Sequence, residues 1–149
     1  LAMITDLLRN DLAKVCKPGS VKVQKLRNLQ KCPTVWHTYS TIKGKLAISP
    51  IEALISMLPG GSVTGCPKKR AIEIIDELEP NRRGVYTGVI GYIMPGQKEL
   101  NFNIAIRTII KKGPKLYLQV GGGIVIDSEE KAEYQETLDK ARSFMNILK

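Results

Sequence analysis

The chain has few aromatic residues, three cysteines and a single histidine, and these shortages exclude several classes of protein. Aromatic residues make up 5% of its 149 residues, without the interleaved basic and aromatic pattern on which single-stranded nucleic acids stack. The cysteines Cys16, Cys32 and Cys66 are odd in number and lack a C-x-x-C spacing. They predict reduced thiols in a cytoplasmic protein rather than disulfides or a zinc site.

Long apolar runs are also missing. No stretch approaches the ~18 residues of a membrane helix, and no signal peptide is visible. What the chain does have is 43% hydrophobic residues, enough to bury a core, and a net charge of +9. Such a charge fits nucleic acid, a membrane surface or small anions. The lysines are scattered and form no run of five, so small anions are favoured, and a basic nucleic-acid-binding module is the weaker alternative.

Hydrophobic periodicity and turn residues indicate an α+β protein of one domain. The chain begins at Leu1 within a helical pattern that has no cap residue before it, which suggests a piece of a longer protein. Helices are expected over roughly 1–15, 50–57 and 67–79, with a last one capped near Asp127 or Ser128. Strands are expected over 20–26, 35–46, 85–94, 99–112, 115–120 and 123–126.

The turns Pro95-Gly96 and Gly113-Pro114 suggest antiparallel hairpins. We therefore expect a mainly antiparallel sheet with the helices after Pro67 and Ser128 packed on one face. The apolar stripe of the last helix comprises Tyr134, Leu138, Ala141, Met145 and Leu148.

Two glycine-rich segments lead into helices. In the first, PGGSVTGCPKKR, backbone N–H groups at the helix start and nearby cations would favour an anion. It is not a Walker A motif, because Gly65 is followed by Cys66 and Pro67 rather than by Lys and Ser or Thr. A plain turn with Pro67 at the first helical position is the alternative. The second segment, Gly121–Gly123, precedes a helix that carries closely spaced glutamates.

Few residues can carry chemistry. Glu133 and Glu136 are three apart, so they share a helix face and could bind Mg²⁺. A solvated glutamate face, with Lys140 pairing with Glu136, is the alternative. Arg107 lies among apolar residues in an expected strand and suits a carboxylate ligand, unless it points to solvent. His37 is the single histidine, and a lone histidine is more often structural than catalytic.

Several long motifs, in order along nearly the whole chain, resemble the C-terminal part of the chorismate-utilising enzymes. They are MITDLLRNDLAKVCKPGSV, PGGSVTGCPKKRAIEIIDELEPNRRGVYTGVIGY, NIAIRT and GGGIVIDSEEKAEYQETLDKAR. That family includes anthranilate synthase component I, aminodeoxychorismate synthase component I, and the isochorismate and salicylate synthases. The segments PGGSVTGCPK and GGGIVIDSEEKAEYQET look closer to the aminodeoxychorismate branch.

The resemblance implies a role for each candidate. His37 matches a histidine near the reacting ring carbon, and Tyr86 matches an aromatic position at the pocket. Arg107 and Lys140 match the arginine that holds a substrate carboxylate and a lysine one turn after the glutamates. Gly61, Ser62, Gly121, Gly122 and Gly123 match the loops that contact substrate. Glu133 and Glu136 match the carboxylates around Mg²⁺, and these two with His37 form the expected catalytic set.

The resemblance also implies a reaction and partners. It predicts amination of chorismate to 4-amino-4-deoxychorismate for para-aminobenzoate and folate synthesis, with ammonia from a glutaminase subunit or domain. Anthranilate, isochorismate or salicylate synthesis are the alternatives, as is an inactive truncated domain. The relatives build one sandwich of two facing sheets, and residues 1–149 would form its C-terminal portion. We therefore expect exposed apolar surface and little activity without an N-terminal half, which would supply another Mg²⁺-binding glutamate and the segment that separates the branches.

Overall fold

The computed structural model describes residues 2–31 and 36–147. Its helices are α1 (Ala2–Val15), α2 (Pro50–Met57), α3 (Gly61–Thr64), α4 (Lys68–Leu78) and α5 (Glu130–Ile147), with one 3₁₀ turn, η1 (Pro95–Gln97). Its strands are β1 (Lys22–Lys31), β2 (Trp36–Lys43), β3 (Val89–Ile93), β4 (Leu100–Ile104), β5 (Ile109–Lys112) and β6 (Lys115–Leu118). The mixed helical and antiparallel content confirms the α+β class.

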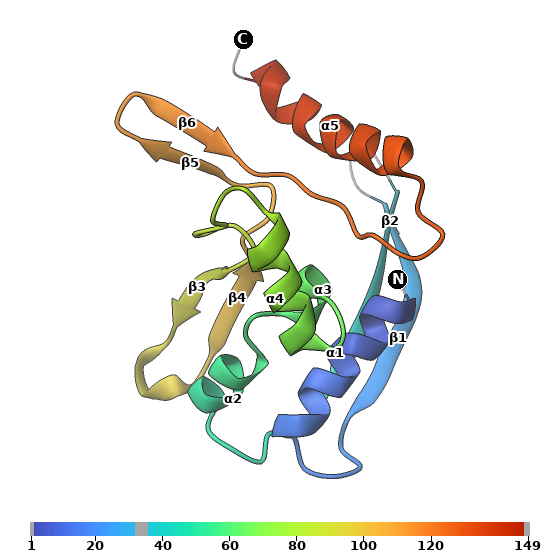
Figure 1. The fold of residues 1–149 in the computed structure, drawn as a ribbon. Helices are drawn as coiled ribbons and strands as arrows, with labels where there is room; N and C mark the ends of the chain where they lie inside the picture. The colour runs from blue at the N-terminus through green and yellow to red at the C-terminus, as the bar shows by residue number, and fades with distance from the viewer. Residues whose placement is uncertain (1, 32–35, 148–149) are drawn as a thin grey trace. The chain divides into compact units, whose positions relative to one another are not determined.

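The chain divides into two compact units. The first runs to Arg82 and also takes in Gly91–Phe102, whereas the second comprises Arg83–Ile90 and the described chain from Asn103 onward. In the first unit α1 lies along the β1–β2 hairpin (Figure 1). Its small core is formed by Val15, Cys16 and Ala53, with Leu12, Val21 and Met57 packed against them.

The helix and hairpin at the start follow the predicted pattern. Helix α1 has its expected length, although Leu1 lies outside the described residues. Strand β1 extends beyond the expected 20–26 because it pairs with β2 along its length, with register shifts on either side of Lys25. The expected start of β2 at Val35 lies outside the described residues.

Helix α2 confirms the cap expected at Ser49. The Glu52 amide donates to Ser49 Oγ, and the Ser49 amide donates to the Glu52 carboxylate, which completes a capping box. Beyond it, the glycine-rich loop contains the short helix α3, which the sequence analysis missed because four residues carry no periodicity. Pro67 is the N-cap of α4, at φ −65° and ψ 133°, and not its first helical residue as expected.

The long strand expected over 99–112 is wrong. It breaks into β4 and β5 at Ala105–Thr108, because Ala105 pairs with Thr87 and Gly88 through backbone hydrogen bonds and Arg107 takes a φ of +51°. The strand expected over 85–94 likewise shortens to β3, since residues 85–88 form a turn.

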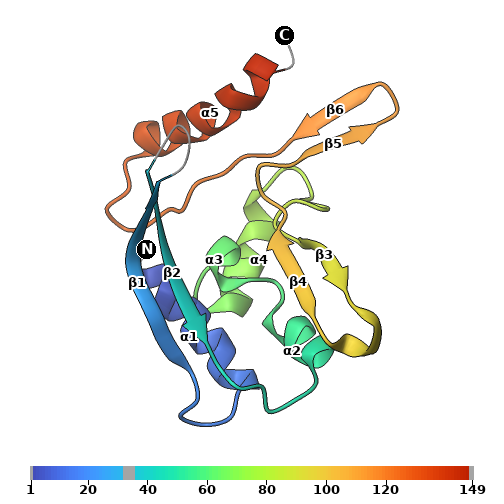
Figure 2. The same cartoon turned by 180° about the vertical axis from the view of Figure 1, so that it is seen from behind.

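Within the described residues, the strands form three two-stranded sheets. Residues 123–126, expected as a strand, are irregular, and α5 begins at Glu130, shortly after the cap expected near Asp127 or Ser128. The segment between β6 and α5 is bonded to α5, because Ser128 donates to Glu133 and Lys140 donates to the Gly121 carbonyl. Figure 2 shows this segment running back beside α5.

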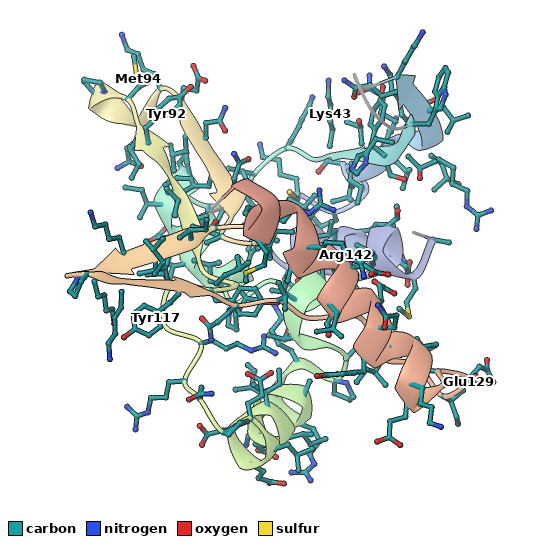
Figure 3. All side chains as sticks on the ribbon, turned by 90° about the horizontal axis from the view of Figure 1, so that it is seen from above. Lys43, Tyr92, Met94, Tyr117, Glu129 and Arg142 are labelled. Atoms are coloured by element: carbon teal, nitrogen blue, oxygen red, sulfur yellow. The ribbon has the colours of Figure 1, made fainter. Side chains whose placement is uncertain are left out.

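Much of the apolar surface of both units is exposed, as expected. Tyr92, Met94 and Tyr117 stand out from the hairpins (Figure 3). On α5, Tyr134, Leu138 and Met145 of the apolar stripe are exposed, whereas Leu148 lies outside the described residues. Within the described part of the chain, no helix is long and apolar enough to cross a membrane.

Candidate functional site

In the second unit, the triple glycine and α5 are tied together by Lys140. Its Nζ donates to the carbonyl oxygen of Gly121 at 3.1 Å and also pairs with the Glu136 carboxylate, one helical turn earlier. This pair is the alternative that the sequence left open for Glu136, and it leaves the Glu136 side chain 53% exposed. Lys140 therefore positions the glycine segment and neutralises one of the two candidate metal ligands.

Glu133 has two differently placed carboxylate oxygens. Oε1 accepts a hydrogen bond from Ser128 Oγ at 2.5 Å. Oε2 is buried and has no hydrogen-bond partner. It faces Gly122 so closely that a Cβ there would lie 3.1 Å from it. A buried carboxylate oxygen without a donor is costly in free energy, so it marks a place where a cation or a donor is missing.

An open hollow of about 400 Å³ lies beside this carboxylate. This volume falls within the usual range for small-molecule sites. Its lining comes from the triple glycine, from the segment that follows it and from one face of α5. The lining residues are Gly122, Ile124, Ser128, Glu130, Glu133, Tyr134 and Thr137.

Tyr86 approaches the same glycine segment from the start of the second unit. A Cβ on Gly121 would lie 2.9 Å from the Tyr86 hydroxyl, so a side chain there would displace the end of the Tyr86 ring. The turn that carries Tyr86 is held by Thr87, whose Oγ1 donates to the Tyr86 carbonyl at 2.6 Å. Thr87 is buried with a φ of +65°, an unfavourable value for a β-branched residue. Such strain persists where the surroundings over-determine it, commonly at functional sites.

The described residues offer one or two carboxylate ligands for a hard cation, and no larger group. They contain no group of three His, Cys, Asp or Glu side chains that could hold a metal ion. Mg²⁺, however, is commonly bound through one or two carboxylates, with waters and substrate oxygens completing its octahedron. The unpartnered Oε2 of Glu133 suits that mode, and Glu136 would supply a second carboxylate if Lys140 released it.

Arg107 lies at a bend between β4 and β5 and is exposed. The strand position expected for it is therefore wrong, because its backbone is in the left-handed region instead of an extended one. Its role toward a substrate carboxylate stays a prediction.

The remaining candidates lie in the first unit. Gly61 is buried against Asp11, whose Oδ2 would lie 3.2 Å from a Cβ at Gly61, and Ser62 follows in α3. His37 is exposed on β2, opposite Gln30 of β1. Their convergence with the second-unit residues on one cleft stays a prediction.

The sequence analysis did not predict the roles of Asp11 and Ser128, which hold the two glycine-containing loops. Asp11 accepts from Lys68 Nζ at 3.1 Å, and Lys68 also donates to the Met57 carbonyl, so the pair fixes the glycine loop between α2 and α4. Asp11 lies between Leu8 and Val15 on the apolar face of α1, and a charge there signals a buried partner. Ser128 gave no such signal, because it stands five residues before Glu133 and not at the capping-box spacing.

Comparison with known proteins identifies the family. The sequence model described as chorismate binding enzyme matches residues 1–146. The chain therefore belongs to the chorismate-binding enzyme family.

Individual relatives come from more than one branch. The chain is 48% identical to aminodeoxychorismate synthase component 1 of Salmonella typhimurium, over 98% of this chain and 32% of the relative. It is 47% identical to an anthranilate synthase component 1 of Haloarcula marismortui, over 99% of this chain and 30% of the relative. The crystal structure of anthranilate synthase component I from Streptococcus pneumoniae matches 95% of this chain and 33% of that chain, with a TM-score of 0.85 and 43% identity. The chain thus spans about a third of the length of these relatives.

Proposed function

We propose that this chain forms part of a Mg²⁺-dependent synthase that aminates chorismate to 4-amino-4-deoxychorismate, with ammonia from a glutaminase partner. The observation that carries the proposal is the Glu133 carboxylate, whose buried Oε2 has no partner beside the triple glycine. Membership of the chorismate-binding family supports chorismate as the substrate. The exposed apolar side chains are consistent with further protein covering this chain in the intact enzyme.

The residues of the second unit suit a small dianion. Lys140 brings a positive charge to Gly121 and would turn from Glu136 toward a substrate carboxylate. The exposed amides of the glycine segment offer donors to the same group, and Tyr86 borders it. Glu133 and Glu136 would hold Mg²⁺, which would neutralise a carboxylate and polarise the substrate for loss of its ring hydroxyl. Arg107 would bind the other carboxylate, and His37 would lie near the reacting carbon.

The aminodeoxychorismate branch is favoured by PGGSVTGCPK and GGGIVIDSEEKAEYQET and by the Salmonella typhimurium relative. Anthranilate synthesis is the second candidate, because the Haloarcula marismortui relative is nearly as similar. The two reactions leave different chemical traces. Aminodeoxychorismate keeps the enolpyruvyl group of chorismate, whereas anthranilate formation releases it as pyruvate.

A chimera tests the proposal. In it, this chain replaces the matching third of the Salmonella typhimurium relative, to which it is 48% identical. We expect the chimera to consume chorismate with ammonium and Mg²⁺ and to form aminodeoxychorismate without pyruvate. We expect the 149-residue chain alone to show little turnover, because an open, wet site weakens the charge interactions that favour hydroxyl loss.

Each outcome separates one alternative. The branch-separating segment of this chimera comes from the relative, so a second chimera, in which the chain replaces the matching part of the Haloarcula marismortui relative, tests the other branch. Faster turnover in that chimera, with pyruvate and anthranilate in equal amounts, would favour the second candidate. A folded chimera that leaves chorismate unchanged would contradict both reactions and favour a non-catalytic role. Rapid turnover by the chain alone would show that its site needs no further protein.

A further inference from the structure

Ser128 fixes one oxygen of Glu133 and leaves the other bare. The Ser128 hydroxyl has one proton, which it donates to Glu133 Oε1 at 2.5 Å. The hydroxyl oxygen is itself held, because the Val125 amide donates to it at 3.0 Å. The Ser128 amide in turn donates to the Val125 carbonyl, also at 3.0 Å. Ser128 is therefore a rigid donor whose direction is set by the loop before α5.

Gly122 limits the carboxylate from the other side. Glu133 Oε2 lies so near this glycine that a Cβ would come within 3.1 Å. With Oε1 tethered to Ser128 and Oε2 against Gly122, the carboxylate cannot turn about its last bond without losing the hydrogen bond. Of the two oxygens, only Oε2 is therefore left for a cation.

A one-oxygen carboxylate discriminates between cations. Mg²⁺ demands a compact octahedron and takes carboxylates through one oxygen, whereas Ca²⁺ is larger and often takes both oxygens of a carboxylate. We propose that Ser128 is a positioning residue that sets the metal preference of the Glu133 site, by tethering Oε1 so that Mg²⁺ is favoured over Ca²⁺. This inference rests on the metal site of the proposed function and adds to it the residue that determines its specificity.

Competition for bound Mn²⁺ tests the inference without an activity assay. Mg²⁺ and Ca²⁺ are titrated against Mn²⁺, whose unbound fraction is read by electron paramagnetic resonance, on the full chain and on the chimera. If the full chain and the chimera give different metal preferences, the preference measured on the chimera is taken. We expect Ser128→Ala to weaken Mg²⁺ binding by about tenfold and Ca²⁺ binding by much less, so that the preference for Mg²⁺ falls.

Two variants control for a structural effect. Ser128→Thr retains a hydroxyl and should restore the original preference. Ser56→Ala removes a hydroxyl that donates to a helix carbonyl, that of Glu52, and should leave the preference unchanged. Circular dichroism and a melting curve check that each variant folds.

Three results would overturn the inference. Equal losses for Mg²⁺ and Ca²⁺ in Ser128→Ala, or no change in either, would remove Ser128 from metal selection while leaving the proposed metal site intact. A Thr variant that behaves like the Ala variant would do the same. Absence of divalent-metal binding in the unsubstituted chimera would overturn the metal site of the proposed function and this inference with it.

Discussion

The two units each hold a carboxylate against a glycine segment, and the carboxylates differ in how they are satisfied. In the first unit both oxygens of Asp11 are paired, Oδ1 with Lys14 and Oδ2 with Lys68. The hollow beside it measures only about 40 Å³. In the second unit Glu133 keeps one oxygen without a partner beside a hollow of about 400 Å³. The paired Asp11 carboxylate secures a loop, whereas the unpartnered Glu133 oxygen is the ligand position of the proposed metal site.

The largest expected effect concerns Glu133. In the chimera, Glu133→Gln should lower kcat/KM by about 100-fold, because it removes the charge at the unpartnered oxygen but keeps its shape. The remaining activity should require more Mg²⁺. Glu129→Gln is the control, since Glu129 is exposed at the start of α5 (Figure 3). Comparable losses of kcat/KM in the two variants would show that Glu133 acts as a surface charge and not as a metal ligand.

Asp11 should matter for stability. Its side chain is 8% exposed and that of Lys68 is 24% exposed, so Asp11→Ala leaves a largely buried ammonium unpaired. We expect a loss of about 2 kcal/mol in the free energy of unfolding, measured by urea denaturation. Adding Lys68→Met should recover part of that loss, because the unpaired charge is gone. If the double variant is no more stable than the single one, Asp11 does not act through Lys68.

The absence of a side chain at Gly122 should matter for metal binding by Glu133. Gly122→Ala places a methyl group about 3.1 Å from Glu133 Oε2 and should weaken Mg²⁺ binding by about tenfold. Gly123→Ala is the matched control, because a Cβ there meets no atom within 4 Å. Mn²⁺ competition measures both. Equal behaviour of the two variants would mean that Glu133 does not bind metal in the position described.

The smallest effect is expected at an exposed ion pair. Arg70 pairs with Glu73 and Glu77 on the surface of α4. Arg70→Ala should change the free energy of unfolding by about 0.5 kcal/mol or less, since solvent screens such pairs. A loss as large as that of Asp11→Ala would show that burial does not separate the two kinds of ion pair in this chain.

Local rules predicted much of the first unit. Ser49-Pro50 before an apolar run is enough to predict the start of α2, because the capping residues are local. The apolar period of α1 predicts a helix, because Leu12 and Val15 pack on the same side of it. The break at Ala105–Thr108 could not be read from the sequence. Apolar β-branched residues continue through it, and the break depends on pairing with Thr87 and Gly88, far along the chain.

In the candidate site, too, some features follow from local spacing and others depend on the fold. The spacing of Glu136 and Lys140 on one helix predicts that they can pair, and the Lys140–Glu136 ion pair confirms it. The difference between the two Glu133 oxygens depends on a loop serine and on the approach of Gly122, and neither follows from spacing. For the same reason, the paired state of Asp11 becomes visible only once Lys68, 57 residues away, is placed beside it.

Mn²⁺ binding to three forms of the chimera tests the distinction between the two carboxylates most directly. The unsubstituted protein and Asp11→Asn should each bind Mn²⁺ and release it to Mg²⁺, because Asp11 only secures a loop. Glu133→Gln should lose that binding. Unchanged Mn²⁺ binding in Glu133→Gln, or its loss in Asp11→Asn with the fold intact, would contradict the assignment of the half-paired carboxylate as the ligand site.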